Sequence, residues 1–385
     1  MAWHSGLVPS NVSACLACTD LDELQELISE LVAIESVNPD LVPLGSGEAA
    51  IAAYVDSWLR SAGLEVTVVE SVQGRPSVVG VVRGSGGGHS LMLNAHMDTV
   101  GAGGMSAPFE PSVREGRLYG RGAYDMKASL AAIMIAARSA RSLHLKGDVI
   151  VTAVADEEVA SFGTSAVLSQ FRADYAIVTE PTELRLCLAH KGFVWLEVET
   201  TGVAAHGSRS DLGVDAIAHM GAILSGVLNL NRRLHEGQRH RLLGTGSVHA
   251  SLIEGGQEMS TYPARCLAKL ERRTVPGEGG ASSLREIQEL IGSERATARV
   301  TLERSPSELA PDHPLSIAVA KAANHPVIVG VSYWMDMALL NSAGIPCVAF
   351  GPGGEGEHAD IEWVDLASVE KCVEVYSHAA KLLCN

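Results

Sequence analysis

The chain has 385 residues, 46% of them hydrophobic, and a formal net charge of −16 at pH 7. This length and composition are typical of a globular protein with about two domains and enough apolar residues for packed cores. Nucleic acids and anionic membranes bind basic protein surfaces, so the acidic charge balance argues against both as partners.

Several features of the sequence bear on cellular location. No segment approaches the roughly 18 consecutive apolar residues of a membrane span, and residues 1–20 lack the basic and apolar segments of a signal peptide. The seven cysteines are an odd number scattered along the chain, which fits reduced thiols better than a disulfide framework. Cys15 and Cys18 form a Cys-x-x-Cys pair, but no second pair completes a zinc site. We therefore expect a cytoplasmic protein.

Helices and strands are predicted to alternate over the first half of the chain. Apolar residues at helical spacing predict the helices, and β-branched or alternating apolar runs predict the strands. The predicted helices cover 19–32, 47–62 and 126–143, and the predicted strands cover 64–70, 77–82, 90–95, 149–155 and 174–179. Such alternation is typical of an α/β sheet covered by helices.

The pattern changes near Lys191 and changes back near residue 309. Between these points the sequence has the content of a small α+β sandwich with its own sheet. Its predicted strands cover 192–201, 245–253 and 262–272, and its predicted helices cover 214–235 and 282–291. After it we expect a helix over 314–323, a strand over 345–350 and a closing helix over 365–383.

These elements predict the domain organisation and the fold class. We expect an α/β catalytic domain, made of residues 1–190 and 309–385, with a mixed, largely parallel sheet flanked by helices. Residues 191–308 are predicted to form an inserted α+β domain.

Three of the predicted buried strands end in side chains of the kind that bind metals. These are His96 and Asp98 after the first, Glu157 and Glu158 after the second, and Glu180 after the third. In open α/β sheets, ligands collect outside the carboxyl ends of the strands, so these side chains are predicted to meet in one crevice. Adjacent side chains of an extended chain point to opposite sides, so one of the two neighbouring glutamates can bind a cation while the other faces its reactant.

Two further residues are candidates for the same site. Asp125 follows a segment with three glycines at the start of a predicted helix, where it could bind a metal, cap the helix or do both. His358 follows the glycine-rich loop that begins at Gly351. Histidines and carboxylates without cysteine suit Zn²⁺, Mn²⁺ or Co²⁺ and disfavour an electron-transfer site. Glu157 would then be free to act as general base and later as general acid.

The motifs that carry chemistry are His96-Met-Asp98-Thr-Val, Gly120-Arg-Gly-Ala-Tyr-Asp125-Met-Lys, Asp156-Glu-Glu158, Thr179-Glu-Pro181, His190-Lys-Gly192 and Gly351-Pro-Gly353 with His358-Ala-Asp. In order and spacing this set resembles the co-catalytic metal amidohydrolases and exopeptidases, which include acetylornithine deacetylase, succinyl-diaminopimelate desuccinylase, carboxypeptidase G and aminoacylase. The resemblance covers nearly the whole chain, from the helix near residue 20 to the last helix.

The resemblance implies two divalent metal ions per chain, with Zn²⁺ as the first expectation and Co²⁺ or Mn²⁺ as alternatives. It also implies a role for each candidate residue. His96 and Glu180 would hold one ion, Glu158 and His358 the other, Asp125 would bridge them, Glu157 would be the catalytic base, and Asp98 would orient His96.

The inserted block resembles the lid and dimerisation domain of the family, which implies a homodimer. His206 matches the histidine that stabilises the oxyanion, a role that the resemblance gives to the partner subunit's His206. Arg273 matches an arginine that clamps the α-carboxylate of the substrate. The alternative for Arg273 is an ion pair with Glu271 or Glu278.

The substrate-binding side carries one departure from the family pattern. Ser260 stands where many relatives have an asparagine, and a hydroxyl offers fewer contacts than an amide. We therefore expect the polar groups of the substrate to be bound differently here. Gly351 and Gly353 are predicted to line the same substrate site.

These observations predict a dinuclear metal hydrolase that cleaves the amide bond of an N-acyl-L-amino acid. A metallo-dipeptidase or carboxypeptidase with the same machinery is the alternative enzyme, since only the pocket of the lid separates the two. A non-catalytic relative that uses the fold for binding is the other alternative. The presence of all the ligand positions together with Glu157 favours an enzyme.

Overall fold

The computed structural model describes residues 21–292 and 295–385. The predicted helix start at Thr19 and the Cys15/Cys18 pair lie outside the described residues. Contacts divide the chain into two units. The first consists of Met1–Val167, Thr179–Leu184 and Gly351–Asn385, and the second of Leu168–Val178 and Arg185–Phe350. The predicted limits of the inserted domain, 191 and 308, stay a prediction.

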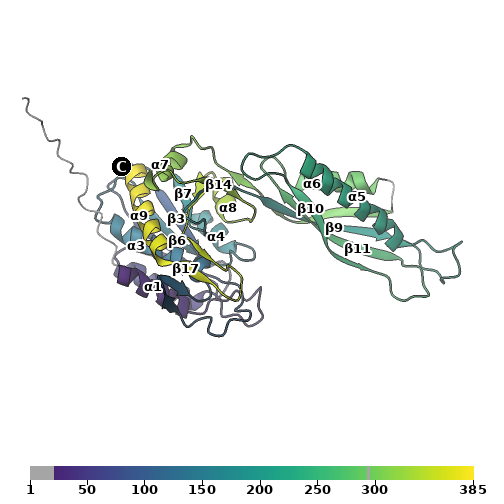
Figure 1. Cartoon of the computed structure of the whole chain (residues 1–385), viewed down its shortest axis with the longest axis horizontal. Coiled ribbons are helices and arrows are strands. Elements are labelled where there is room, and N and C mark those ends of the chain that lie inside the picture. The colour runs from purple at the N-terminus through teal and green to yellow at the C-terminus, as the bar shows by residue number, and fades with distance from the viewer. Residues whose placement is uncertain (1–20, 293–294) are drawn as a thin grey trace, which may run out of the picture. The chain divides into compact units, whose positions relative to one another are not determined.

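The first unit contains strands in the order β1-β2-β6-β3. Of these, β3 and β6 are labelled in Figure 1. Their bounds are β1 Glu65–Val69, β2 Ser77–Val82, β6 Val149–Val154 and β3 Leu91–His96. β2 pairs antiparallel with both β1 and β6, whereas β6 and β3 are parallel, so the sheet is mixed as predicted. Every residue of β3 and β6 is buried, which explains why both have largely apolar sequences without alternation.

Helices cover this sheet. α3 (Ala128–Ala140) packs on β3 and β6 and also contacts α1 (Leu21–Ala33) and α9 (Leu366–Leu383). Because α3 is covered on most sides, its sequence is rich in Ala, Ile and Met and has almost no polar face. α2 (Ala49–Ser61) packs on β1 and β2.

The helix predicted over 126–143 begins later than expected, with α3. An irregular turn, Ala123–Lys127, precedes it, and Asp125 lies there with a non-helical φ of −115° and ψ of 92°. The N-cap position of α3 is Lys127, so of the two roles considered for Asp125, capping of this helix does not occur. The turn depends on Gly122, whose φ is 77° and whose Cβ, if present, would lie 2.7 Å from Cγ2 of Thr99.

A small antiparallel sheet joins the segment before this turn to the segment around His358. Its strand order is β16-β17-β5-β4. The bounds are β16 Gly354–Glu355, β17 Trp363–Asp365, β5 Arg117–Tyr119 and β4 Ser112–Arg114. β17 pairs with β5, with Val364 opposite Leu118. Because β5 leads to Asp125 and β16 and β17 flank His358, the sheet brings two candidate ligands from distant parts of the sequence together.

The second unit contains strands in the order β7-β15-β8-β13, with β14 also paired to β8. Their bounds are β7 Tyr175–Val178, β15 Cys347–Ala349, β8 Leu186–His190, β13 Ser307–Glu308 and β14 Ile328–Val331. The helices that accompany them are α7 Pro314–Ala322 and α8 Met337–Ser342. A further helix, α4 Phe162–Gln170, has residues in both units. α7 packs on β8 and β15, and α8 packs on β7 and β15.

The second unit also contains a separate antiparallel sheet in the order β10-β11-β9-β12. Its elements are β9 Gly192–Thr201, β10 Ser247–Gly255, β11 Arg265–Thr274, β12 Ala296–Arg304, α5 Ala216–Glu236 and α6 Gly280–Ile291. Both helices lie along one face of the sheet (Figure 1). Alternate residues of β9, namely Val194, Leu196 and Val198, are buried in the core under these helices. This is the predicted α+β layer.

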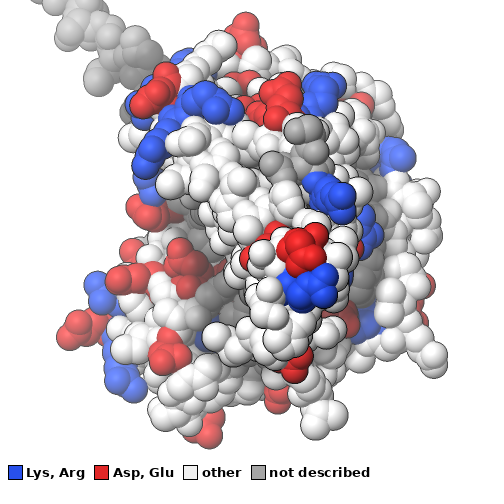
Figure 2. Space-filling view, turned by 90° about the vertical axis from the view of Figure 1, so that its right-hand side faces the viewer, with Lys and Arg blue, Asp and Glu red and all other residues white. Residues whose placement is uncertain are grey.

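The surface carries charges of both signs. Figure 2 shows Lys and Arg side chains interspersed with Asp and Glu on the visible face, rather than gathered in one basic patch. Among the described helices, none combines the length and apolarity needed to cross a membrane.

Candidate metal centre

Six of the predicted site residues come together within the first unit. They are His96, Asp125, Glu157, Glu158, Glu180 and His358. Ligand atoms of His96, Asp125 and Glu158 all lie within 4.8 Å of one another, and so do those of His96, Glu157 and Glu180. The predicted convergence of ligands from three strand ends is therefore present in the structure.

Asp125 lies between the two histidines. Its Oδ1 is 3.0 Å from Nε2 of His96, and its Oδ2 is 3.3 Å from Nε2 of His358. His96 Nε2 is also 3.7 Å from Glu180 Oε1, and His358 Nε2 is 3.2 Å from Glu158 Oε2. One carboxylate oxygen thus faces each histidine, which is the geometry that a bridging ligand requires.

The site favours positive charge. Burial would lower the pKa of His96, but its hydrogen bond to Asp125 and the charge of Glu180 raise that pKa well above its ordinary value. Hydrogen bonds to Asp125 and Glu158 raise the pKa of His358 to about 10. Burial, and then the charge of Asp125, raise the pKa of Glu158. A cation, whether a proton or a metal ion, therefore relieves repulsion between these carboxylates.

The residues also fit divalent metal ions in their chemistry. Imidazole nitrogens and carboxylate oxygens are the ligands that Zn²⁺, Mn²⁺ and Co²⁺ share. Oε1 of Glu158 is buried and has no hydrogen-bond partner among the described residues. Leaving such an atom without a partner costs about 1–3 kcal/mol, and a bound metal ion would satisfy it.

Asp98 lies beneath the ligands and is fully buried. Its backbone carbonyl is 2.9 Å from Nδ1 of His96, whereas its nearest carboxylate oxygen is 3.7 Å away. The carboxylate instead accepts hydrogen bonds from the backbone N–H groups of Glu157 and Glu158. It also accepts one from Nδ2 of Asn38. Asp98 thus contacts both a candidate ligand and the turn that carries the candidate base.

Sequence reasoning missed a buried ionic network on the other side of this turn. Nη2 of Arg75 is 2.6 Å from Oε1 of Glu48 and 3.2 Å from Oδ1 of Asp156. The backbone N–H of Asp156 donates to Glu48, and Nδ2 of Asn38 also donates to Asp156. The side chains of Glu48 and Asp156 are 0% exposed, and that of Arg75 is 8% exposed. No local pattern could have identified Arg75, because its partners Glu48, Asp40 and Asp156 are 27, 35 and 81 residues away.

The two glycines predicted to line the substrate site differ in their surroundings. A Cβ atom on Gly351 would lie 2.1 Å from the backbone oxygen of Glu180, so this position requires close approach of two backbones. The same atom on Gly353 would meet nothing nearer than Ser368 Oγ, at 3.7 Å. Gly351 therefore packs against the segment that carries a candidate ligand.

The remaining predicted residues lie in the second unit. Nδ1 of His206 is 2.9 Å from Oγ of Ser208, and the backbone of His206 pairs with that of Thr261. The backbone oxygen of Ser260 accepts a hydrogen bond of 2.6 Å from the N–H of Gly207. Ser260 and His206 are therefore held on adjacent antiparallel segments.

Arg273 forms the ion pair that was the alternative to substrate binding. Its Nε lies 2.6 Å from Oε1 of Glu271, and its guanidinium lies over the ring of Phe193, 5.1 Å from the centroid. Glu278 pairs instead with the neighbouring Arg272. The side chain of Arg273 is 33% exposed.

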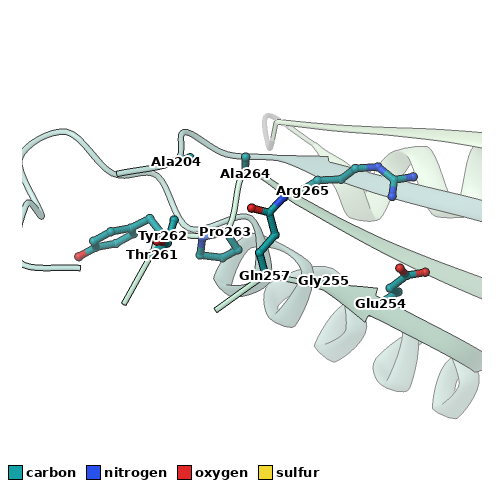
Figure 3. Close-up of a pocket in the computed structure, with 10 residues that line it drawn as sticks. Ala204, Glu254, Gly255, Gln257, Thr261, Tyr262, Pro263, Ala264 and Arg265 are labelled. Atoms are coloured by element: carbon teal, nitrogen blue, oxygen red, sulfur yellow. The ribbon is translucent and has the colours of Figure 1, made fainter. Parts of the chain in front are cut away.

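A pocket of about 320 Å³ lies beside the His206 segment. Its lining includes Ala204, Glu254, Gln257, Thr261, Tyr262 and Arg265. In Figure 3 the ring of Tyr262 lies at one end, and Glu254 and Arg265 extend toward the other. The backbone N–H of Tyr262 donates to the oxygen of Ala205, so the pocket wall and the His206 segment are directly connected.

Comparison with known proteins agrees with this geometry. Residues 92–382 match the family model of peptidase family M20/M25/M40. Acetylornithine deacetylase from Myxococcus xanthus is 30% identical over 387 residues, which cover 94% of this chain and 98% of that protein.

Solved structures share the fold. Aminopeptidase PepT from Bacillus cereus has a TM-score of 0.79 at 17% identity, with 95% of this chain and 99% of that chain covered. A dinuclear metal binding peptidase of the M20 family from Bacillus subtilis has a TM-score of 0.70 at 17% identity, with 94% and 98% covered. These matches confirm the predicted α/β fold class and the predicted metal-dependent amidohydrolase. The chain belongs to peptidase family M20/M25/M40.

Proposed function

We propose that this protein hydrolyses the amide bond of an N-acyl-L-amino acid, using two divalent metal ions. The observation that carries the proposal is the position of Asp125 between His96 and His358, with Glu157 and Glu180 on the His96 side. The relatedness to acetylornithine deacetylase from Myxococcus xanthus supports an acylated amino acid as the substrate class. The dinuclear peptidase from Bacillus subtilis, which shares the fold, supports two ions.

Two ions in this site would polarise the scissile carbonyl and lower the pKa of water, which makes water a better nucleophile near neutral pH. His96 and Glu180 are proposed to hold one ion, and Glu158 and His358 the other, with Asp125 shared. Zn²⁺ is the first expectation from the ligand set, and Co²⁺ and Mn²⁺ are alternatives.

Glu157 is proposed to move the proton. Its carboxylate belongs to the group of ligand atoms with His96 and Glu180, and its backbone N–H is fixed by Asp98. Because it is not needed as a ligand in this assignment, it can take a proton from the attacking water. It then gives that proton to the departing amine. His206 is proposed to donate a hydrogen bond to the oxyanion, and Arg273, Ser260, Gly351 and Gly353 to contact the substrate.

A metallo-dipeptidase or carboxypeptidase is the second candidate function. The aminopeptidase from Bacillus cereus shares the fold, and the same metal site would serve either reaction. The pocket beside the His206 segment, with Ser260 nearby, is where the two activities would differ. A non-catalytic relative is the least favoured candidate, because the ligand positions and Glu157 are all present.

We also propose a homodimer that forms through the inserted domain, residues 191–308. β10 is an edge strand that pairs only with β11 among the described strands. Apart from the N–H of Val248, which donates to Asn231 Oδ1, its outer edge offers backbone donors and acceptors for pairing. Leu252 and Ile253 on β10 are 63% and 57% exposed, and Leu228 and Ile217 on the adjoining α5 are 54% and 43% exposed. Pairing of two β10 strands about a two-fold axis would bury part of this exposed apolar surface.

A dimer would allow the partner subunit's His206 to act in the site, as the family resemblance implies. Leu252→Glu is expected to give a monomer by light scattering, and activity would fall if His206 acts across the interface. A cytoplasmic location is proposed as well, because the cysteines of the described region are thiols rather than disulfides.

The decisive experiment measures amine release from N-acetyl, N-succinyl and longer N-acyl amino acids and from dipeptides. Metal-free protein is tested alone and after addition of Zn²⁺, Co²⁺ or Mn²⁺. Metal-dependent hydrolysis of the acyl amino acids but not the dipeptides supports the first candidate, and the reverse pattern supports the second. Two bound ions without hydrolysis of either group would exclude both.

A further inference from the structure

Arg121 and Glu362 form a buried ion pair next to the candidate metal centre. Nη1 of Arg121 lies 2.7 Å from Oε2 of Glu362, and the two side chains are 2% and 1% exposed. The residues are 241 positions apart in the sequence. A buried pair of this kind brings little net stability compared with apolar residues of the same size. Its contacts therefore point to a different purpose.

Glu362 holds the backbone of the turn that carries Asp125. Its Oε1 accepts hydrogen bonds from the N–H groups of Tyr124 and Asp125, at 2.9 and 3.0 Å. Its Oε2 accepts another from the N–H of Gly122, at 2.9 Å. The turn is closed by a hydrogen bond from the N–H of Lys127 to the oxygen of Gly122, but the backbone dihedrals of Asp125 within it are not helical. The carboxylate of Glu362 therefore adds the contacts that fix the position of the candidate bridging ligand.

Arg121 holds the loop that carries His358. Its Nη2 donates to the backbone oxygen of Ala359, at 2.8 Å, and its Nε donates to that of Gly101, at 3.0 Å. The side chain of His358 is 54% exposed, and its backbone has a φ of 59°, in the left-handed region. An exposed ligand on such a turn depends on its neighbours for its position. Ala359, the next residue, is tied down by Arg121.

The pair therefore links the two ligands that face each other. Glu362 contacts the Asp125 turn, Arg121 contacts the His358 loop, and the ion pair joins the two groups of contacts. Because both side chains are buried and each of their nitrogen and oxygen atoms has a hydrogen-bond partner, movement of one segment relative to the other would break charged hydrogen bonds.

We propose that Arg121 and Glu362 are positioning residues that set the placement of His358 relative to Asp125 and thereby determine the affinity of one of the two metal positions. The proposal rests on the proposed function for the identity of the ligands. Outer contacts of this type typically change metal affinity by about tenfold to a hundredfold. The metal position made by Glu158 and His358 is the one affected most, because the pair contacts the segments of both His358 and Asp125, whereas the position made by His96 and Glu180 shares only Asp125 with it.

The test is a titration of metal-free protein with Co²⁺ alone. Calorimetry measures the affinity, and visible absorption reports the environment of the bound ion. Glu362→Gln removes the charge and places an amide N–H₂ against backbone donors. It is expected to weaken binding of one Co²⁺ by about tenfold to a hundredfold, to change the absorption spectrum and to weaken binding of the other Co²⁺ less. His358→Ala identifies the affected position, because it should lower the affinity for the same Co²⁺ ion.

Arg138→Gln is the matched control, because Arg138 also forms an ion pair, with Glu23, but on helices α3 and α1. It is expected to bind two Co²⁺ with wild-type affinity. Wild-type affinity for both ions and an unchanged spectrum in folded Glu362→Gln would overturn the proposal. If circular dichroism shows that Glu362→Gln is unfolded, the same titration is made on Arg121→Lys. Weaker binding of one Co²⁺ then supports the proposal, and wild-type affinity for both ions overturns it. Lysine keeps the positive charge but lacks the guanidinium group that donates to the backbone oxygens of Ala359 and Gly101.

Failure of the proposed function would be seen separately. A wild-type protein that binds two Co²⁺ but hydrolyses neither acyl amino acids nor dipeptides contradicts the proposed reaction. In that case the binding measurements on the variants still support or overturn the positioning role.

Discussion

The carboxylate of Asp98 holds the backbone N–H of Glu157, with Oδ1 3.1 Å from the nitrogen. Its other oxygen is 3.2 Å from the backbone nitrogen of Glu158. The peptide units that carry the proposed base and one proposed ligand are thus anchored to a single buried side chain. Through its backbone carbonyl the same residue also orients His96.

Asp98→Asn should therefore disturb the position of Glu157 without removing any ligand. The amide N–H₂ of asparagine would face one of the two backbone donors, so the turn has to shift. We expect kcat to fall by about tenfold to a hundredfold, as for other residues that orient a metal site, with a smaller change in KM. Steady-state kinetics on the best substrate of the panel measures both.

Asp148→Asn is the control for this variant. Asp148 also accepts a backbone N–H, that of Gly84, but it precedes β6 whereas Glu157 follows the same strand. Its kcat should stay within about twofold of the wild type, as for surface changes away from a site. Equal losses in the two variants would show that general destabilisation, not orientation of Glu157, explains the effect.

Glu157→Gln tests the proposed base directly. The amide keeps the shape of the side chain but cannot accept a proton, so turnover should fall by at least about 10²–10⁴-fold. Binding of two metal ions should be retained, because Glu157 is not one of the proposed ligands. Metal analysis and single-turnover amine release are the measurements, with Glu65→Gln, a substitution at the exposed ion pair with Arg83, as the control. A nearly normal rate would mean that another residue is the base.

Short-range patterns predicted the elements well. The predicted strands 77–82 and 192–201 coincide with β2 and β9, and the ligands after three strands do meet. β12 was missed although alternating residues, from Ala296 to Arg304, are half-buried. That signal was present in the sequence. The small strands around His358 are too short to leave a pattern.

The supporting residues of the site were not predictable in the same way. Arg75 and Glu362 are isolated charged residues in the sequence, and such residues are usually exposed. Only the fold brings Arg75 to Asp156 and Glu362 to Arg121, over 81 and 241 positions. A pattern of spacing reports which side chains share a face, but it carries no information about partners on distant elements.

The network around Arg75 makes a prediction about stability. Arg75→Met would leave Glu48 and Asp156 buried without their counter-charge, and breaking a buried ion pair in this way costs about 3–5 kcal/mol. Urea denaturation should show this loss in the free energy of unfolding. Arg60→Met removes an exposed pair with Asp56 instead, so a change below about 1 kcal/mol is expected there. Similar losses in both variants would contradict the importance of burial.

The burial of His190 leads us to expect that stability depends on pH. It is fully buried, its Nδ1 donates to the backbone oxygen of Lys191, and burial lowers its pKa from 6.5 to about 4. Above pH 6.5 the residue is neutral in both the folded and the unfolded chain. Between pH 6.5 and 4 the unfolded chain takes up a proton that the folded chain does not, so the free energy of unfolding decreases as the pH is lowered. The total loss is roughly 3 kcal/mol.

His190→Asn removes this titration and keeps a side-chain N–H donor. The free energy of unfolding of the wild type should therefore approach that of the variant as the pH falls from 7 to 4. His235→Asn, at an exposed position of α5, is the control for the substitution itself. A constant difference for His190→Asn would show that the burial of His190 does not contribute to acid sensitivity.

The glycines of the 351–353 loop make a matched pair of variants. Gly351→Ala would place a Cβ atom 2.1 Å from the backbone oxygen of Glu180, so either the loop or the segment that carries Glu180 has to move. We expect a loss of about 3 kcal/mol in stability and weaker binding of the metal ion that Glu180 is proposed to hold. Gly353→Ala meets nothing nearer than 3.7 Å and should be close to neutral in thermal melting and metal titration. If instead Gly351→Ala melts and binds metal like the wild type, the close packing of this loop against Glu180 does not constrain the site.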